Sequence, residues 1–261
     1  DDIKQIPAGY KLAAQILAAS IAVYNGVIIN FIKFPLANTE GGLVLLRALR
    51  IPITVFWIIG ITNTVNLIDG LDGLAAGVST IASLSLAAVA YNVGQYNVSI
   101  LLAILAGASL GFLPYNFNPA QIFMGDAGSL VIGYLLATMS VEGLIKGATT
   151  IAVAIPVLAL GVPVFDTAFA IIRRLINKRP IMEADKGHLH HRLLEHGLSQ
   201  KQTVLILYII SSVLGGSSII ISDVAKSSAY LIIGVISILI LYGAYRIGIT
   251  KKVAEKRGAK I

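Results

Sequence analysis

Residues 51–92 read IPITVFWIIGITNTVNLIDGLDGLAAGVSTIASLSLAAVAYN, two apolar runs separated by a short segment that carries two aspartates. Each run, 51–68 and 73–92, is long enough to cross a bilayer as a helix, which takes about 20 residues. Six further runs have the same character: 12–31, 98–115, 127–145, 149–172, 202–222 and 228–248. We therefore predict an all-α polytopic integral membrane protein with about eight transmembrane helices, forming a single transmembrane domain over residues 1–261.

The composition of the chain excludes several classes of protein. Of its 261 residues, 56% are hydrophobic and 13% are charged, and the mean hydropathy is +0.84. A soluble domain carries about 25% charged residues, so this chain has too little charge to cover a soluble surface. A soluble enzyme and a nucleic-acid-binding module are therefore excluded. The chain has no cysteine, and it has neither a disulfide framework nor a thiolate metal site.

The basic residues indicate which face of the membrane each loop occupies. Eight crossings place on one side the segments 1–11, 69–72, 116–126, 173–201 and the C-terminal tail. This side holds 15 of the 20 lysines and arginines, and cytoplasmic loops are the ones enriched in these residues. We therefore expect it to be the cytoplasmic side. On the other side, the stretch 32–50, with Pro35 and Gly41-Gly42, is predicted to form a short extracytoplasmic hairpin.

Polar side chains collect on the predicted cytoplasmic side. The segment NTVNLIDGLDGLAAG (63–77) contains four polar residues spaced every three positions: Asn63, Asn66, Asp69 and Asp72. On a helix this spacing places them on one ridge, and such groups at the end of an apolar span need polar partners. A helix end with Asp-Gly turns is the structural alternative. Four polar residues in register favour a binding or catalytic site.

Two later segments add to this side of the membrane. The motif FMGDAGSL places Asp126 at the mouth of a span, where a carboxylate suits either a helix N-cap or a metal ligand. The polar loop 173–201 contains the histidine run of GHLHHRLL among several basic residues, which suggests an anion clamp. Asp166, late in the sixth predicted span, is expected to pair with Arg173 or Arg174 on the following turns.

These residue types favour phosphoryl-transfer chemistry. Carboxylates and amides without cysteine suit a hard cation such as Mg²⁺, with Mn²⁺ as the alternative. Histidines and basic side chains suit a polyphosphate, and the membrane location suggests a lipid as the second substrate. We therefore predict Mg²⁺-dependent phosphoryl transfer between a nucleotide and a lipid phosphate. An ion-coupled transporter is the alternative class, but the acidic residues lie at span ends and no internal repeat is visible.

Four segments of the chain together resemble one enzyme family. They are DDIKQIPAGYK (1–11), NTVNLIDGLDGLAAG (63–77), PYNFNPAQIFMGDAGSL (114–130) and GHLHHRLL (187–194). In order and spacing they resemble the motifs of the polyprenyl-phosphate N-acetylhexosamine-1-phosphate transferases, glycosyltransferase family 4. The HLHH form and the segment VPVFDT resemble the bacterial undecaprenyl-phosphate GlcNAc-1-phosphate transferase branch. Family members have ten or eleven spans, so the resemblance implies that N-terminal spans are missing from this chain.

The resemblance also implies a role for individual residues. It implies that the metal is held by Asp126 and Asn66. The residues that it implies for catalysis are Asp1, Asp2, Lys11, Asp69 and His190. The residues that it implies for binding the nucleotide sugar are Asp72, Asn116, Phe123, His188, His191 and Arg192, with Phe123 as a stacking face for uracil.

The implied reaction joins UDP-GlcNAc and undecaprenyl phosphate into undecaprenyl-diphospho-GlcNAc and UMP, and so initiates a cell-envelope glycan such as teichoic acid or O-antigen. Phospho-MurNAc-pentapeptide transfer is the alternative within the family. Direct attack by the lipid phosphate and a phospho-enzyme route are both open. The expected location is a bacterial or archaeal plasma membrane with the active site facing the cytoplasm. The expected partners are a UDP-N-acetylhexosamine, a polyprenyl phosphate, the bilayer and a second copy in a homodimer, and no nucleic acid.

Overall fold

The computed structural model describes residues 6–29, 40–144, 150–177 and 187–246, with the side chains at 40–48 and 150 left out of the description. Within those ranges every regular element is a helix, which confirms the predicted fold class. The helices are α1 (Ala8–Tyr24), α2 (Glu40–Leu67), α3 (Leu74–Asn92), α4 (Tyr96–Asn116), α5 (Gly125–Gly143), α6 (Thr150–Ala159), α7 (Gly161–Ile176), α8 (Leu189–Glu195), α9 (Gln200–Asp223) and α10 (Lys226–Arg246).

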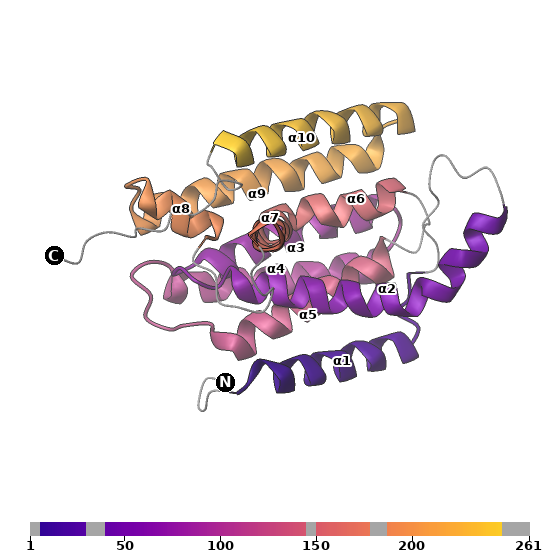
Figure 1. Cartoon of the computed structure of the whole chain (residues 1–261), viewed down its shortest axis with the longest axis horizontal. Helices are drawn as coiled ribbons and strands as arrows, with labels where there is room; N and C mark the ends of the chain where they lie inside the picture. Colours follow the sequence, from indigo (N-terminus) through magenta and orange to yellow (C-terminus); the bar gives the residue numbers. More distant parts are fainter. Residues whose placement is uncertain (1–5, 30–39, 145–149, 178–186, 247–261) are drawn as a thin grey trace.

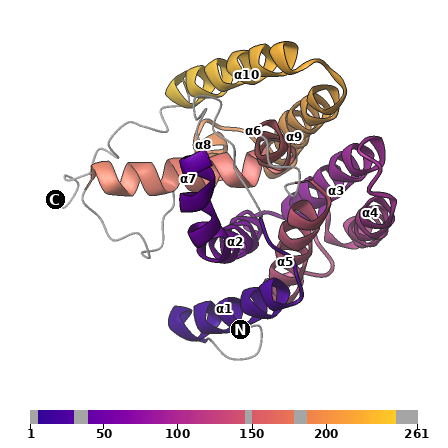
Figure 2. The same cartoon turned by 90° about the vertical axis from the view of Figure 1, so that its right-hand side faces the viewer.

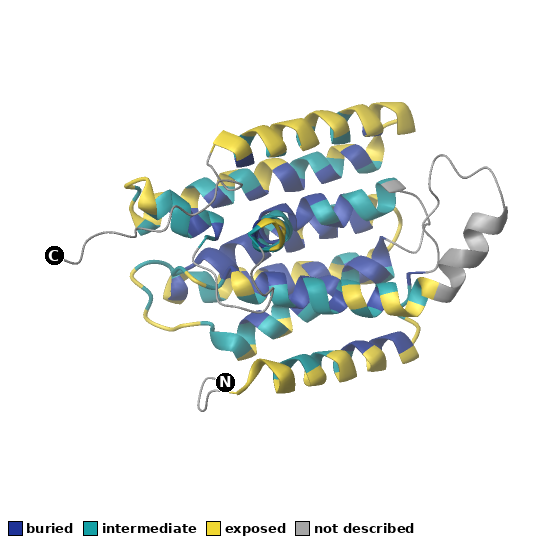
Figure 3. Cartoon of the chain, viewed as in Figure 1, coloured by how far each residue is buried: buried dark blue, intermediate teal, exposed yellow. Residues whose placement is uncertain are grey.

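The long helices lie side by side along the long axis of the molecule, with α3 in their midst (Figure 1). Helix α3 packs against α4 and α9, and α2 packs against α5. Within the apolar window of each helix, 78% of residues are buried in α3 but only 11% in α10. Helix α10 therefore lies at the periphery (Figure 3), on the opposite edge of the bundle from α1 (Figure 2).

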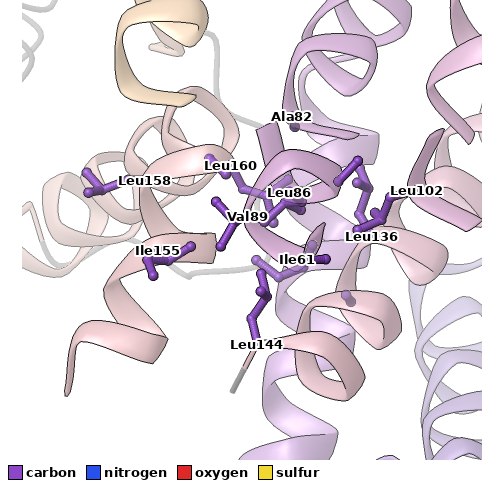
Figure 4. Close-up of a cluster of buried hydrophobic side chains, with 14 of the residues drawn as sticks. Ile61, Ala82, Leu86, Val89, Leu102, Leu136, Leu144, Ile155, Leu158 and Leu160 are labelled. Carbon is purple, nitrogen blue, oxygen red and sulfur yellow. The ribbon is translucent and has the colours of Figure 1, made fainter. Parts of the chain in front are cut away.

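The largest of three apolar clusters among the described residues holds α2, α3, α4 and α5 together. Leu86 and Val89 of α3 meet Ile61 of α2, Leu102 of α4 and Leu136 of α5 in one cluster of buried side chains (Figure 4). All five side chains are less than 5% exposed, and in a membrane it is the close van der Waals packing of such side chains that holds helices together. This core fixes the relative positions of α2, α4 and α5, whose ends carry the predicted site residues.

The eight predicted spans are confirmed only in part. In the described part of the chain, four helices are long and apolar enough to cross a membrane: α3, α4, α9 and α10. The α6–α7 pair would make a fifth if it formed one span. The first predicted span, 12–31, contains a helix of 17 residues, α1, which ends at Tyr24. The structure therefore supports a helical membrane protein with four to five recognisable spans.

The predicted continuous span 149–172 is wrong, because α6 and α7 meet at an angle of 93°. Pro163 lies in the first turn of α7. A proline ring would clash with the carbonyl four residues earlier in a continuous helix, but it is tolerated in a first turn, where the N–H has no helical partner. Helix α7 therefore turns across the bundle and is seen end-on in Figure 1.

The predicted hairpin at 32–50 is wrong where it can be compared with the structure. Residues 40–50 belong to the start of α2, while 32–39 lie outside the described residues. The run LVLLRALR at 43–50 consists mainly of good helix formers and contains no turn residue, which accounts for the helix. Pro52 therefore lies inside α2 and not in its first turn.

The segments that we predicted to share one face of the membrane do share one end of the bundle. The start of α1, the α2–α3 turn, the α4–α5 loop and α8 all lie at the left-hand end in Figure 1. The α3–α4 turn and the α9–α10 turn lie at the other end. The alternation of loops therefore gathers most of the predicted site residues in one region.

Candidate functional site

Asp126 is the centre of a polar cluster made by three helices. Its Oδ2 accepts a hydrogen bond and ion pair from Lys11 Nζ of α1 at 2.6 Å. Its Oδ1 accepts a hydrogen bond from Asn66 Nδ2 of α2 at 2.9 Å. The side chains of Lys11 and Asp126 are each 27% exposed, so solvent reaches the pair. We call Lys11, Asn66 and Asp126 the carboxylate cluster.

The N-cap alternative for Asp126 is wrong. The N-cap position of α5 is Met124, without a side-chain hydrogen bond, and Asp126 lies within the first turn. Gly125 precedes it with φ of +67°, a conformation that glycine adopts without steric cost. The side chain of Asp126 therefore points to neighbouring helices rather than to its own N–H groups. Ser129, one turn later, accepts a second hydrogen bond from Asn66 at 2.9 Å.

The predicted polar ridge of α2 is correct only for its first half. Helix α2 ends at Leu67, so Asn63 and Asn66 lie on its last turn. The amide of Asn63 pairs with Gln15 of α1, with its Nδ2 2.7 Å from Gln15 Oε1. Asp69 and Asp72 follow in non-helical turns because the chain reverses towards α3 through Gly73, whose φ is +80°.

Asp72 is held in a second cluster, formed with the α4–α5 loop. Its Oδ2 accepts hydrogen bonds from Asn118 Nδ2 at 2.9 Å and from the Ala120 backbone N–H at 3.1 Å. The other N–H of Asn118 donates to Gln200 Oε1 of α9 at 2.8 Å. Sequence reasoning missed Gln200, although the capping box at Ser199 marks the start of the helix that carries it.

Asn116 and Phe123 have opposite environments in the same loop. Asn116 is 2% exposed; its Oδ1 accepts from the Gly73 N–H at 3.1 Å and its Nδ2 donates to the Ile122 carbonyl at 2.9 Å. Asn116 therefore ties the α2–α3 turn to the α4–α5 loop. Phe123 is 76% exposed, so its ring is accessible for stacking. The bond to Gly73 places Asn116 beside the turn that carries Asp72.

The histidine run forms the N-terminus of α8 and packs towards the α2–α3 turn. His188 and His190 are buried, whereas His191 is half-buried. A Cβ added at Gly70 would lie 2.9 Å from His190 Nε2, so His190 lies directly against the turn that carries Asp69 and Asp72. The histidines and the acidic turn are therefore one site.

His190 is not a source of positive charge near neutral pH. Burial, together with the charges of His191 and His188 and against an opposing effect of Asp166, lowers the pKa of His190 to about 4. The anion clamp that we predicted from the whole histidine run therefore does not include a charged His190. A neutral imidazole at this place can donate or accept hydrogen bonds or take up a proton.

Asp166 has other partners than Arg173 or Arg174, with which we expected it to pair. Its carboxylate accepts from His188 Nδ1 at 2.9 Å and from the Leu189 N–H at 2.7 Å. Two arginines instead donate to the carbonyl of Gly187: Arg173 Nη1 at 2.9 Å and Arg192 Nε at 3.2 Å. Asp166 and Arg173 lie about two turns apart on α7, beyond the spacing of three or four residues at which helical side chains meet, which explains the difference.

The carboxylate cluster fits a divalent cation that is held partly by substrate. In the described part of the chain, no three His, Asp or Glu side chains lie close enough together to form a protein cage for a metal. Mg²⁺ commonly binds through one or two carboxylates together with substrate phosphates. Asp126 would supply the carboxylate, and Asn66 would supply its amide oxygen after a rotation of its side chain, since its Nδ2 now faces Asp126.

A groove of about 540 Å³ extends from the carboxylate cluster between α1, α2 and α5. Lys11 and Asp126 line one part of it, and the rest is mainly apolar, with Tyr10, Leu130 and Tyr134 among the lining residues. An apolar channel with a charged pair suits a lipid that carries a phosphate. Two predicted residues, Asp1 and Asp2, lie outside the described residues.

Comparisons with known proteins match this arrangement to one family. Residues 1–144 match the family model of glycosyl transferase family 4. The chain is 42% identical to the probable undecaprenyl-phosphate N-acetylglucosaminyl 1-phosphate transferase of Bacillus subtilis, over 98% of this chain and 70% of that protein. It is 38% identical to the decaprenyl-phosphate N-acetylglucosaminephosphotransferase of Mycobacterium tuberculosis (strain CDC 1551 / Oshkosh), over 80% of this chain and 56% of that protein.

Similarity to a third kind of relative is less extensive. The phospho-N-acetylmuramoyl-pentapeptide-transferase of Staphylococcus saprophyticus is 42% identical, but over only 50% of this chain and 42% of that protein. The two N-acetylglucosamine relatives match over most of the chain, including the α8 region. This chain spans between 56% and 70% of the length of those two relatives.

Proposed function

The chain belongs to glycosyl transferase family 4, and from that premise we propose that it transfers GlcNAc-1-phosphate from UDP-GlcNAc to undecaprenyl phosphate. The products are undecaprenyl-diphospho-GlcNAc, which starts a cell-envelope glycan, and UMP. The observation that carries the proposal is the Lys11–Asp126 pair in the apolar groove, beside Asn66. The greater coverage of the N-acetylglucosamine relatives supports GlcNAc over the pentapeptide-bearing sugar.

The end of the bundle that carries the site faces the cytoplasm of a bacterial cell in this proposal. Lysines and arginines concentrate in the loops at that end, as they do in cytoplasmic loops. UDP-sugars are polar and cannot cross a bilayer, so a cytoplasmic site matches the side on which such a donor is made. The acidic side chains of the site lie at this end of the bundle rather than midway along the helices (Figure 1), which argues against the transporter alternative.

The lipid phosphate is the nucleophile in the proposed reaction. Its oxygen attacks the β-phosphorus of UDP-GlcNAc, a new P–O bond forms, and the bond to the UMP oxygen breaks. A phosphate monoester has a second pKa near 6 and is mostly dianionic at pH 7, so no strong base is required. Lys11 then has two tasks, to orient the dianion and to offset its charge. When bound at Asp126, Mg²⁺ supplies further charge neutralisation on the diphosphate.

The nucleotide end of the substrate lies over the cluster that contains Asp72. Oδ2 of Asp72 is occupied by Asn118 and Ala120, whereas none of the described residues hydrogen-bonds its Oδ1. That oxygen is suited to accept from a uracil or ribose donor. Phe123, exposed in the adjacent loop, supplies an aromatic face for the base. A phospho-enzyme route remains the mechanistic alternative, with Asp69 as the carboxylate nucleophile.

The test uses the full-length protein in detergent with undecaprenyl phosphate and Mg²⁺. UMP release is followed with UDP-GlcNAc and, separately, with UDP-MurNAc-pentapeptide. Release with UDP-GlcNAc alone is the expected result. Release with only the pentapeptide nucleotide would keep the family chemistry and overturn the sugar assignment. Inversion of configuration at a chiral β-phosphorus supports direct attack, whereas retention supports the phospho-enzyme.

A further inference from the structure

A buried carboxylate–imidazole pair connects α7 to α8. The side chains of Asp166 and His188 are 5% and 7% exposed, and Asp166 Oδ2 lies 2.9 Å from His188 Nδ1. The other oxygen, Oδ1, accepts from the Leu189 backbone N–H at 2.7 Å. A carboxylate that is ionised has only acceptors to offer, so His188 carries its proton on Nδ1. The pair therefore fixes both the tautomer and the orientation of His188.

The orientation of His188 is transmitted to His190 and to the acidic turn. The two rings are parallel, with 4° between their planes and 5.8 Å between their centroids. His190 in turn lies against Gly70, where an added Cβ would come within 2.9 Å of its Nε2. A continuous series of contacts thus runs from Asp166 on α7 to the turn that carries Asp69 and Asp72.

We propose that Asp166 is a positioning residue for the transfer reaction: it fixes His188, and through the stacked rings it holds His190 against the Gly70 turn. Asp166 is too deeply buried to contact a substrate itself. The inference rests on the proposed function, because it places His190 beside the reacting phosphates. The inference also assigns a role to the 93° bend between α6 and α7. Helix α7, which follows the bend, brings Asp166 to the N-terminus of α8.

A purely structural role is the competing explanation, because removing one member of a buried pair destabilises a protein. The substitution Asp166→Asn keeps the size of the side chain and isolates the charge. Its amide oxygen can accept from only one side, so its NH₂ group must face either His188 Nδ1 or the Leu189 N–H. Thr167→Val is a matched control on the next residue of α7, since the buried Thr167 hydroxyl has no partner among the described residues.

The experiment measures kcat and KM for UMP release by the full-length protein, together with ¹⁵N spectra of its labelled histidine rings. We expect Asp166→Asn to lower kcat about 10- to 100-fold, the range seen when groups that orient a functional histidine are lost. The KM for UDP-GlcNAc should stay within about threefold. The Nδ1–H signal that disappears in His188→Gln should be altered by Asp166→Asn, whereas Thr167→Val should match the wild type. Asp166→Glu should restore part of kcat.

Two results would overturn the inference. One is an Asp166→Asn variant whose kcat per folded molecule equals that of Thr167→Val. The other is an unchanged His188 ring signal in Asp166→Asn. Failure of the proposed function is distinguishable from both, because it appears as absent UMP release by the wild type while the ring spectra still report on the Asp166–His188 pair.

Discussion

The Lys11–Asp126 pair and the Asp166–His188 pair lie at the same end of the bundle but differ in their access to water. The first pair is 27% exposed on both sides, and an ion pair of this kind contributes only about 0–1 kcal/mol to stability. The second pair is almost completely enclosed, so loss of one partner leaves a buried polar group without compensation. The first pair can therefore exchange partners at little cost, whereas the second cannot.

This difference separates two tasks within one site. The carboxylate cluster joins α1, α2 and α5 through side chains that can be transferred to a phosphate or a cation. The buried pair joins α7 and α8 and keeps the histidines in place. Substitutions in the carboxylate cluster should therefore abolish the reaction with little effect on stability. Substitutions in the buried Asp166–His188 pair should affect both the reaction and stability.

The largest effect is expected for Asp126→Asn. This change removes the charge that balances Lys11 and that would hold a cation, so Mg²⁺-dependent UMP release should fall about a thousandfold. Because the pair is exposed and contributes little to folding, the Tm should change by only a few degrees. Glu142→Gln, at the opposite end of the same helix, is the control and should retain activity. Full activity of Asp126→Asn would remove the metal assignment.

Gly70→Ala tests the contact between the two regions. The φ of Gly70 is not in the left-handed region, so alanine is compatible with the backbone, and the new Cβ must displace His190. A displacement of about 1 Å at such a place can cost about a hundredfold in rate, and we expect kcat to fall 10- to 100-fold. Gly60→Ala, where a Cβ meets nothing within 4 Å, should leave kcat unchanged. Equal rates for the two variants would show that His190 does not act in the reaction.

The buried histidines next to Asp166 should also make the protein sensitive to acid. The pKa of His190 is about 4 in the folded protein and about 6.5 in an unfolded chain, so the unfolded state takes up a proton first. The contribution of the neutral His190 to the free energy of unfolding is fully present above pH 6.5. It should be lost between pH 6.5 and 4, by up to about 1.4 kcal/mol per pH unit. Thermal unfolding of His190→Gln should show a smaller fall over this range than the wild type or His196→Gln, an exposed control. Parallel curves for all three proteins would contradict the assignment.

The sequence alone located the carboxylate cluster because its members lie at the ends of long apolar runs. Asp126 and Asn66 are polar residues where apolar side chains are expected, and both proved to be adjacent. The row from Asn63 to Asp72 was predicted as one ridge, and the prediction failed after Leu67, where α2 ends and residues 68–73 form turns before α3. Periodicity predicts a face only as long as the helix continues.

The Asp166–His188 pair could not be predicted because it depends on tertiary packing. We expected Asp166 to pair with Arg173, but the two lie about two turns apart on one helix, beyond the spacing of three or four residues at which helical side chains meet. The bend before α7 presents Asp166 to a different element, and the two prolines that mark it, Pro156 and Pro163, do not specify the direction of the turn. Gln200 was missed for the same reason, since its hydrogen bond with Asn118 joins segments 82 residues apart.

The smallest effect is expected for Gln200→Ala. It tests whether the cluster around Asp72 behaves like the solvent-accessible carboxylate cluster or like the buried Asp166–His188 pair. Asn118 donates one N–H to Asp72 and the other to Gln200, so loss of Gln200 frees Asn118 to rotate and loosens Asp72. A neutral hydrogen bond contributes about 0.5–1.5 kcal/mol, so the KM for UDP-GlcNAc should rise about 2- to 10-fold with kcat unchanged. The control is Gln121→Ala, since Gln121 is exposed in the α4–α5 loop that carries Asn118. A fall in kcat instead would place Asp72 among the groups that act on the reacting phosphates.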